Sequence, residues 1–91
     1  MNDRITGMQV LARVAALGSL SGAARALGMS QTMATKHIAA LESRLNVKLL
    51  HRSTRRVTLT DPGRRYLESA ERILAELDEA ETLASREGVE V

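Results

Sequence analysis

The 91-residue chain has room for one small domain, and it contains no cysteine, which excludes disulfides, thiolate metal sites and cysteine nucleophiles. Hydrophobic residues make up 44% of the chain and Tyr66 is the only aromatic residue, so the composition favours a core of packed helices. The net charge of +2 conceals a division: residues 36–65 carry eight basic and two acidic residues, whereas residues 66–91 carry two basic and eight acidic ones. This division fits either a nucleic-acid contact joined to a solvated helix, or ordinary solvated faces.

Two helices are predicted at the start of the chain, the second of them short. Residues 3–17 carry apolar residues at helical spacing, and Gly18 follows where a left-handed cap would end that helix. The segment Ser19-Leu20-Ser21 is predicted to supply the cap of a second, alanine-rich helix over residues 22–27. Ser21 is the better candidate, because its hydroxyl can accept from the free amides of the next turn. Gly28 is expected to end this second helix.

A third helix is predicted between Ser30, its expected N-cap, and Asn46, its expected C-terminal end. One buried stripe is expected from apolar residues that repeat at helical spacing: Ala34, Ile38, Leu41 and Leu45. The opposite face collects short polar or basic side chains: Gln31, Thr32, Thr35, Lys36, Ala39 and Ser43. This face lacks the mixture of glutamate and lysine that an ordinary solvated helix carries, so it indicates a contact surface.

A turn with glycine, from Leu27 to Ser30, joins the second and third helices in the pattern of a helix-turn-helix. In that motif the first helix braces the second across the phosphate backbone, and the second lies in the major groove. DNA contacts are therefore expected from the third helix and its start: Ser30, Gln31, Thr32, Thr35, Lys36 and His37. A plain helical hairpin in another kind of small domain is the alternative, and His37 could equally face solvent.

A short two-stranded hairpin is predicted next, with strands over residues 49–52 and 57–60 and a turn over residues 53–56. Its tip is basic through three arginines: Arg52, Arg55 and Arg56. Arginines at a hairpin tip can enter a narrow minor groove or hold phosphates. An exposed turn that is basic only for solubility is the alternative, and it becomes less attractive directly after a helix-turn-helix.

A long helix is predicted from the Asp61-Pro62 boundary to about Arg86, with Thr60 or Asp61 as its cap and Pro62 at the first helical position. Apolar residues recur at heptad spacing over roughly three heptads, which indicates pairing with another helix. The expected dimer interface is Tyr66, Ala70, Ile73, Leu74, Leu77, Ala80 and Ala84. The predicted units are a winged helix-turn-helix over residues 1–60, a dimerisation helix over 61–87 and a disordered tail over 88–91.

Candidate catalytic or metal-binding residues are not found in the sequence. His37 and His51 have no acidic or cysteine partners at ligand spacing, no serine has a His–Asp pair arranged around it, and no glycine-rich phosphate loop is present. We therefore expect no enzyme activity, no cofactor and no metal. No apolar run approaches the ~18 residues of a membrane span, and residues 1–4 do not begin a signal peptide, so a cytoplasmic protein is expected.

Several separated segments together resemble the N-terminal domain of LysR-type transcriptional regulators. The resemblance covers about residues 4–87, and its matching segments are Leu17–Leu27, Ser30–Gln31, Ile38–Glu42 and Leu49–Gly63. It implies a mostly α fold, in which a winged helix-turn-helix of three helices and a two-stranded β-wing precedes a long C-terminal dimerisation helix. The family's larger effector-binding domain has no counterpart in these 91 residues, so a small-molecule effector is expected only if such a domain follows.

The resemblance also implies a function: sequence-specific binding of a homodimer to an inverted repeat in double-stranded DNA of the bacterial nucleoid. The third helix would lie in the major groove and the wing, residues 52–56, in the minor groove. By the same resemblance Gln31, Thr35 and Lys36 contact bases or nearby phosphates, Ser21 touches phosphate, and Arg55 enters the minor groove. Thr32-Met33-Ala34 stand where the family commonly has Pro-Ala-Val. The rival hypothesis is a winged helix that serves only protein interaction or dimerisation, without DNA binding.

Overall fold

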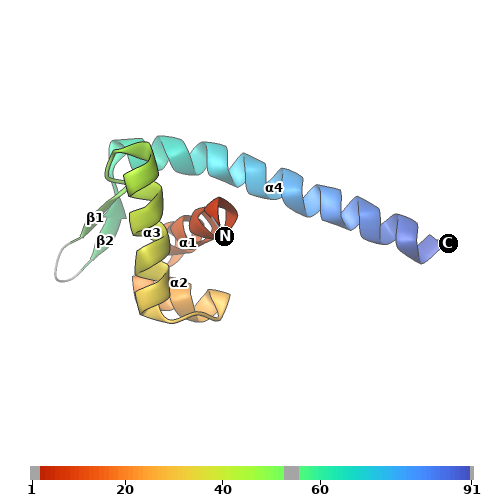
Figure 1. The fold of residues 1–91 in the computed structure, drawn as a ribbon, viewed down its shortest axis with the longest axis horizontal. Coiled ribbons are helices and arrows are strands. Elements are labelled where there is room, and N and C mark those ends of the chain that lie inside the picture. Colours follow the sequence, from red (N-terminus) through yellow and green to blue (C-terminus); the bar gives the residue numbers. More distant parts are fainter. Residues whose placement is uncertain (1–2, 53–55, 91) are drawn as a thin grey trace.

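The computed structural model describes residues 3–52 and 56–90, and it consists of four helices and one two-stranded antiparallel sheet. The elements are α1 (Arg4–Leu17), α2 (Leu20–Leu27), α3 (Gln31–Leu45), β1 (Leu50–Arg52), β2 (Val57–Leu59) and α4 (Asp61–Glu90). Helices α1 to α3 pack together, the β1–β2 wing lies beside α3, and α4 extends far beyond them (Figure 1). The prediction of a mostly α winged helix with a long C-terminal helix is confirmed.

The ends of the first three helices follow the local sequence. Gly18, Gly28 and Asn46 all adopt the left-handed conformation, with φ of 71°, 71° and 57°, and each amide donates to a carbonyl of the helix that it ends. Ser30 caps α3 as predicted, because its Oγ accepts from the Met33 amide at 3.1 Å. Asp3 caps α1 by accepting from the Thr6 amide at 3.0 Å.

The predicted cap of the second helix is wrong. Ser19, not Ser21, caps α2, since the Ser19 Oγ accepts from the Gly22 amide at 2.9 Å. Ser21 lies within the first turn, and its hydroxyl is 2.9 Å from that of Ser19. The helix starts earlier than expected because Leu20 packs into the core and is buried there.

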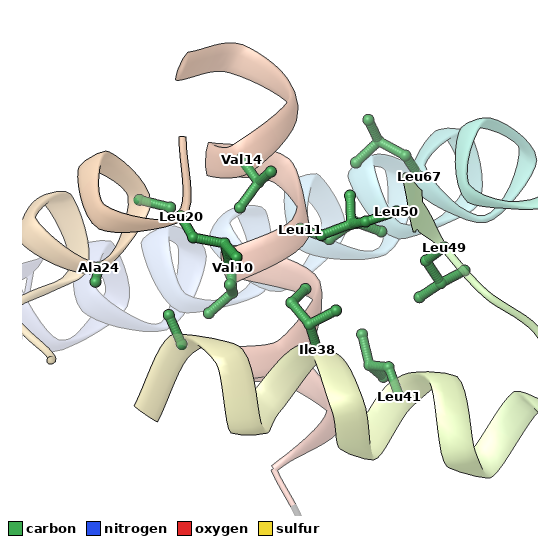
Figure 2. Packing of buried hydrophobic residues seen from close by; sticks show 12 residues of the cluster. Val10, Leu11, Val14, Leu20, Ala24, Ile38, Leu41, Leu49, Leu50 and Leu67 are labelled. Carbon is green, nitrogen blue, oxygen red and sulfur yellow. The ribbon is translucent and has the colours of Figure 1, made fainter. Parts of the chain in front are cut away.

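The hydrophobic core lies where α1, α2 and α3 meet the start of the wing. Its largest completely buried side chains are Leu11, Ile38, Leu49, Val10 and Val14 (Figure 2). Leu67 brings the first turns of α4 into the same cluster. The predicted stripe of α3 is correct for Ala34, Ile38 and Leu41, whereas Leu45 at its end is exposed. The wing and α4 are therefore held to the three-helix body by the same core.

The wing is a short hairpin in which Leu50 pairs with Leu59 and Arg52 with Val57. Thr60 directly follows the second strand and is the cap of α4, because its Oγ1 accepts from the Gly63 amide at 2.9 Å. Pro62 is consequently the second residue of the helix, one position later than predicted.

Helix α4 continues to Glu90, so the predicted end near residue 86 is too early. A glycine inside a helix, such as Gly88, costs about 1 kcal/mol, and this cost does not by itself end a long helix. Within the described residues, no helix combines the length and apolar character that crossing a membrane requires.

The two halves of α4 differ in what they contact. Ala70 is 0% exposed and Leu67 is 9% exposed, because the first half packs on the chain's own helices, chiefly α1. Ala70 therefore belongs to the core of the chain and is not available to a partner, which corrects its predicted place in a dimer interface. Tyr66 is half-buried against the core, and this burial raises the pKa of its phenol. Ile73 is 45% exposed, so the apolar face becomes accessible from there onward.

Candidate nucleic-acid interface

Helix α3 presents one continuous exposed stripe on the side opposite to its buried residues. The stripe contains Thr32, Lys36, Ala39 and Ser43, which are all exposed and recur at helical spacing. Its side chains are short, apart from the basic Lys36, and none is acidic. A small, uncharged-to-basic helix surface fits the major groove of DNA, whose base edges offer acceptors and donors to hydroxyl and ammonium groups.

The start of α3 gathers most of the predicted DNA contacts. Gln31 is exposed beside the stripe, and Thr35 is half-buried on the flank that faces the wing. The Ser30 hydroxyl is exposed and accepts from a backbone amide of the helix. Amides in the first turn of a helix lack partners within that helix, and together they attract an anion such as a phosphate. Ser21 is exposed on the first turn of α2.

His37 lies on the other flank of α3, next to the start of α1. A shallow pocket of about 230 Å³ brings it together with Asp3, Arg4 and Arg44. The Thr6 side chain and amide, by their hydrogen bonds to Asp3, hold the pKa of this carboxyl below its usual value, and nearby His37 adds to the effect. His37 is half-buried there, away from the exposed stripe. Its position favours a supporting role over base contact.

The wing supplies the second group of predicted contacts. His51 and Arg52 are exposed on β1, and Arg56 is exposed just before β2. Arg55, predicted to enter the minor groove, lies outside the described residues together with Ser53 and Thr54. Arg52 is thus the last residue of β1, and Arg56 directly precedes β2. Figure 1 shows that this wing lies beside α3, and the DNA contacts of all three arginines stay predictions.

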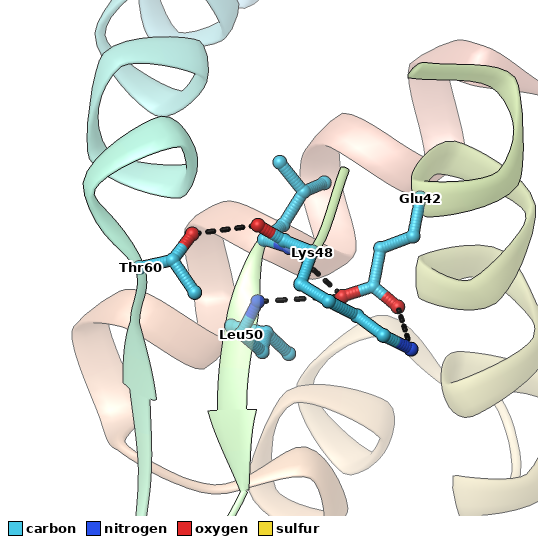
Figure 3. Close-up of polar contacts among 5 residues, drawn as sticks. Glu42, Lys48, Leu50 and Thr60 are labelled. Atoms are coloured by element: carbon cyan, nitrogen blue, oxygen red, sulfur yellow. Dashed lines mark hydrogen bonds and ion pairs between the residues drawn. The ribbon is translucent and has the colours of Figure 1, made fainter. Parts of the chain in front are cut away.

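A buried polar junction, which the sequence did not reveal, fixes the wing against α3. One Glu42 carboxylate oxygen accepts from the Leu49 amide at 2.9 Å and from the Leu50 amide at 3.3 Å, and the other lies 3.8 Å from the Lys48 ammonium (Figure 3). The Thr60 hydroxyl donates to the Lys48 carbonyl at 2.7 Å and so joins α4 to the same point. The available signal was that Glu42 is the only acidic residue between positions 4 and 60.

Between α3 and β1 the surface forms an open crevice of about 500 Å³. Thr35 and Ala39 line its helix side, and Lys48, His51 and Arg52 line its wing side. Among the described residues, no three His, Asp or Glu side chains approach closely enough to hold a metal ion. Glu42 also lines the crevice, but it is largely buried, so the exposed charges there are those of Lys48 and Arg52. The crevice adjoins the exposed stripe of α3 through Ala39.

Comparisons with known proteins agree with this geometry. The family model for bacterial regulatory helix-turn-helix proteins of the lysR family matches residues 5–64. An HTH-type transcriptional regulator of Xanthomonas campestris pv. campestris is 42% identical over 90% of this chain and 23% of its own length. The HTH-type transcriptional activator AaeR of Escherichia coli is 42% identical over 85% of this chain and 25% of its own. The chain thus spans about a quarter of the length of these relatives.

Two solved structures that contain DNA resemble the fold closely. A CbnR DBD–DNA complex superposes with a TM-score of 0.80 at 38% identity, covering 93% of this chain and 97% of that one. A BenM DBD complex with benA site 1 DNA has a TM-score of 0.83 at 26% identity, covering 90% of this chain and 92% of that one. The family match extends over most of the chain, and the wing, the exposed α3 stripe and the long α4 all accompany it. The chain belongs to the lysR family of bacterial regulatory helix-turn-helix proteins.

Proposed function

We propose that this chain binds double-stranded DNA sequence-specifically as a homodimer on an inverted repeat, and so regulates transcription. Helix α3 would enter the major groove and the wing an adjacent minor groove. The observation that carries the proposal is the exposed, acid-free stripe of α3 from Thr32 to Ser43, flanked by the basic wing. A cytoplasmic, nucleoid-associated location belongs to the same proposal, and any small-molecule effector would act through a domain outside these residues.

The charge distribution supports DNA over a protein partner. Phosphate neutralisation by Lys and Arg releases counterions, so affinity for duplex DNA should fall steeply as salt is raised. A selection of bound fragments from a random duplex pool, followed by titration at two salt concentrations, tests the proposal directly. Enrichment of a two-fold symmetric site with strongly salt-dependent affinity is the expected result. Absence of duplex binding at low salt would instead favour the protein-interaction hypothesis.

Base reading is expected to depend on Gln31, which is exposed at the start of α3. The Gln31→Ala variant should relax the preference for one base pair in each half-site, at a cost of about 1–3 kcal/mol. Lys36→Ala is the comparison variant: loss of its positive charge should weaken binding to all duplexes about equally and reduce the salt dependence. The measurement is the selected-site profile of each variant. An unaltered profile for Gln31→Ala would remove this residue from the reading set.

Dimerisation is proposed to use the outer half of α4. The exposed apolar face of this half includes Leu83, which is 53% exposed. The other proposed contacts are the residues of the predicted dimer interface without the buried Ala70. The proposed contacts are Ile73, Leu74, Leu77, Ala80 and Ala84, with Tyr66 at the edge of the core. Both helices carry an excess of acidic residues, so added salt should strengthen the dimer while it weakens DNA binding.

The Leu77→Glu variant tests this interface, because a charge buried between two helices is strongly disfavoured. We expect the dissociation constant of the variant dimer to be at least about tenfold higher than that of the wild-type dimer. Thr82→Glu is the matched control, since Thr82 is exposed on the opposite side of the same helix. Equilibrium sedimentation at micromolar concentration measures both. A wild-type chain that stays monomeric, or equal effects of the two variants, would contradict the proposed interface.

A further inference from the structure

The crevice between α3 and β1 lies where two DNA grooves would meet. If α3 occupies the major groove and the wing the adjacent minor groove, the sugar-phosphate backbone that separates these grooves must pass between them. This step rests on the proposed function. The fold leaves room for that backbone in the crevice, which has a volume of about 500 Å³. Thr35 and Ala39 line one side of it, and Lys48 lines the other.

The two walls of the crevice differ in chemistry. The wing side carries Lys48, His51 and Arg52, and the Lys48 side chain is 82% exposed. The helix side carries the hydroxyl of Thr35 and the methyl group of Ala39. The wing side therefore offers cationic and N–H donors to an anion. The side chains of Thr35 and Ala39 on the helix side are too small to keep an anion out of the crevice.

One acidic residue, Glu42, also lines the crevice, but its carboxylate is largely buried and already hydrogen-bonded to the chain. The Glu42 side chain is only 11% exposed, and one of its oxygens accepts from two backbone amides (Figure 3). Its contact with Lys48 is long at 3.8 Å and lies near solvent, where such ion pairs contribute little stability. The Lys48 ammonium can thus turn toward a phosphate without a large loss elsewhere.

We infer that this crevice is a binding site for a phosphodiester of the DNA backbone. Lys48 and His51 donate hydrogen bonds to the phosphate. The small side chain of Ala39 leaves the crevice wide enough for the DNA strand. Backbone contacts of this kind position a protein on the duplex and carry no sequence information, so they persist on non-cognate DNA. Neither Lys48 nor Ala39 would read a base; together they would set how closely α3 approaches the groove floor.

The first test removes the donor. Binding of Lys48→Gln to a fluorescent mixed-sequence duplex is titrated by anisotropy at several salt concentrations. The slope of log affinity against log salt should become shallower by about 0.9, the value of one lost phosphate contact. Arg72→Gln is the control with the same change in charge, because Arg72 is exposed on α4 and contacts Ser69. Its slope should match that of the wild type.

The second test fills the opening. Ala39→Leu should weaken binding to the same duplex by about tenfold or more, because the larger side chain would clash with the DNA backbone. Ala40→Leu is the matched control on the other flank of α3, and both alanines are exposed, so both variants should unfold at the wild-type temperature. Wild-type behaviour of Lys48→Gln and Ala39→Leu, or equal effects in their controls, would overturn the inference. Failure of the wild-type chain to bind duplex would instead overturn the proposed function.

Discussion

Gly63→Ala is expected to lower the free energy of unfolding by at least about 3 kcal/mol, the upper part of the range for overpacked sites. A Cβ at Gly63 would overlap the carbonyl oxygen of Leu49 and lie 3.0 Å from its carbonyl carbon. Both are backbone atoms, so no side-chain rotation can relieve the clash. The same oxygen accepts from the Thr60 amide at 2.9 Å, so its displacement would also break the contact between the wing and α4.

Gly22→Ala is the control for this prediction. Its Cβ would meet nothing closer than the Ser19 Oγ at 3.4 Å, an ordinary contact. Since alanine is favoured over glycine inside helices, Gly22→Ala should be neutral or more stable by up to about 1 kcal/mol. Urea denaturation followed by circular dichroism compares the two variants. Equal midpoints for Gly63→Ala and the wild type would show that the start of α4 can move away from Leu49.

Glu42→Ala should have the second-largest effect, a loss of about 3 kcal/mol. The variant leaves the amides of Leu49 and Leu50 without their acceptor, and each unsatisfied buried donor costs about 1–3 kcal/mol. Because these amides belong to the entry of the wing, the amide protons of β1 should also exchange faster. Hydrogen exchange measured by NMR reports this local effect separately from global unfolding.

Two milder variants separate the contacts of the same carboxylate. Glu42→Gln keeps an oxygen that can accept from both amides, so it should lose about 1 kcal/mol or less. Lys48→Gln breaks only the exposed ion pair and should cost under about 1 kcal/mol. If Lys48→Gln were as destabilising as Glu42→Ala, the ion pair rather than the backbone contacts would hold the junction.

The C-terminal ends of α1, α2 and α3, the N-cap of α3 and its exposed face could be predicted because their signals are local. Gly18, Gly28 and Asn46 each mark a left-handed residue at a helix end, and Ser30 caps the helix that follows it. Periodicity identified most of the buried stripe of α3, and with it the opposite stripe that carries Lys36. These features depend on residues within one or two turns of each other, where sequence patterns are most informative.

The errors arose where tertiary packing decides between similar local choices. Ser19 and Ser21 are both plausible caps, and burial of Leu20 selects the first. Ala70 fits the heptad pattern, yet the chain's own helices already cover it. Glu42 resembles any solvated glutamate until the chain brings the amides of the wing to it. Such choices depend on residues that are distant in the sequence, which no local pattern contains.

The contact between Gly63 and Leu49 has a consequence for the geometry of the proposed dimer on DNA. Helix α4 has 30 residues and is therefore about 45 Å long, so a tilt of about 10° at its start would move its far end by about 8 Å. This displacement exceeds two base-pair steps of about 3.4 Å each. The separation of the two α3 helices would thus depend on the angle set at this contact as well as on the pairing of the α4 helices. Changes at Gly63 or Thr60 that leave the fold intact should alter the preferred half-site spacing without altering the bases that are read.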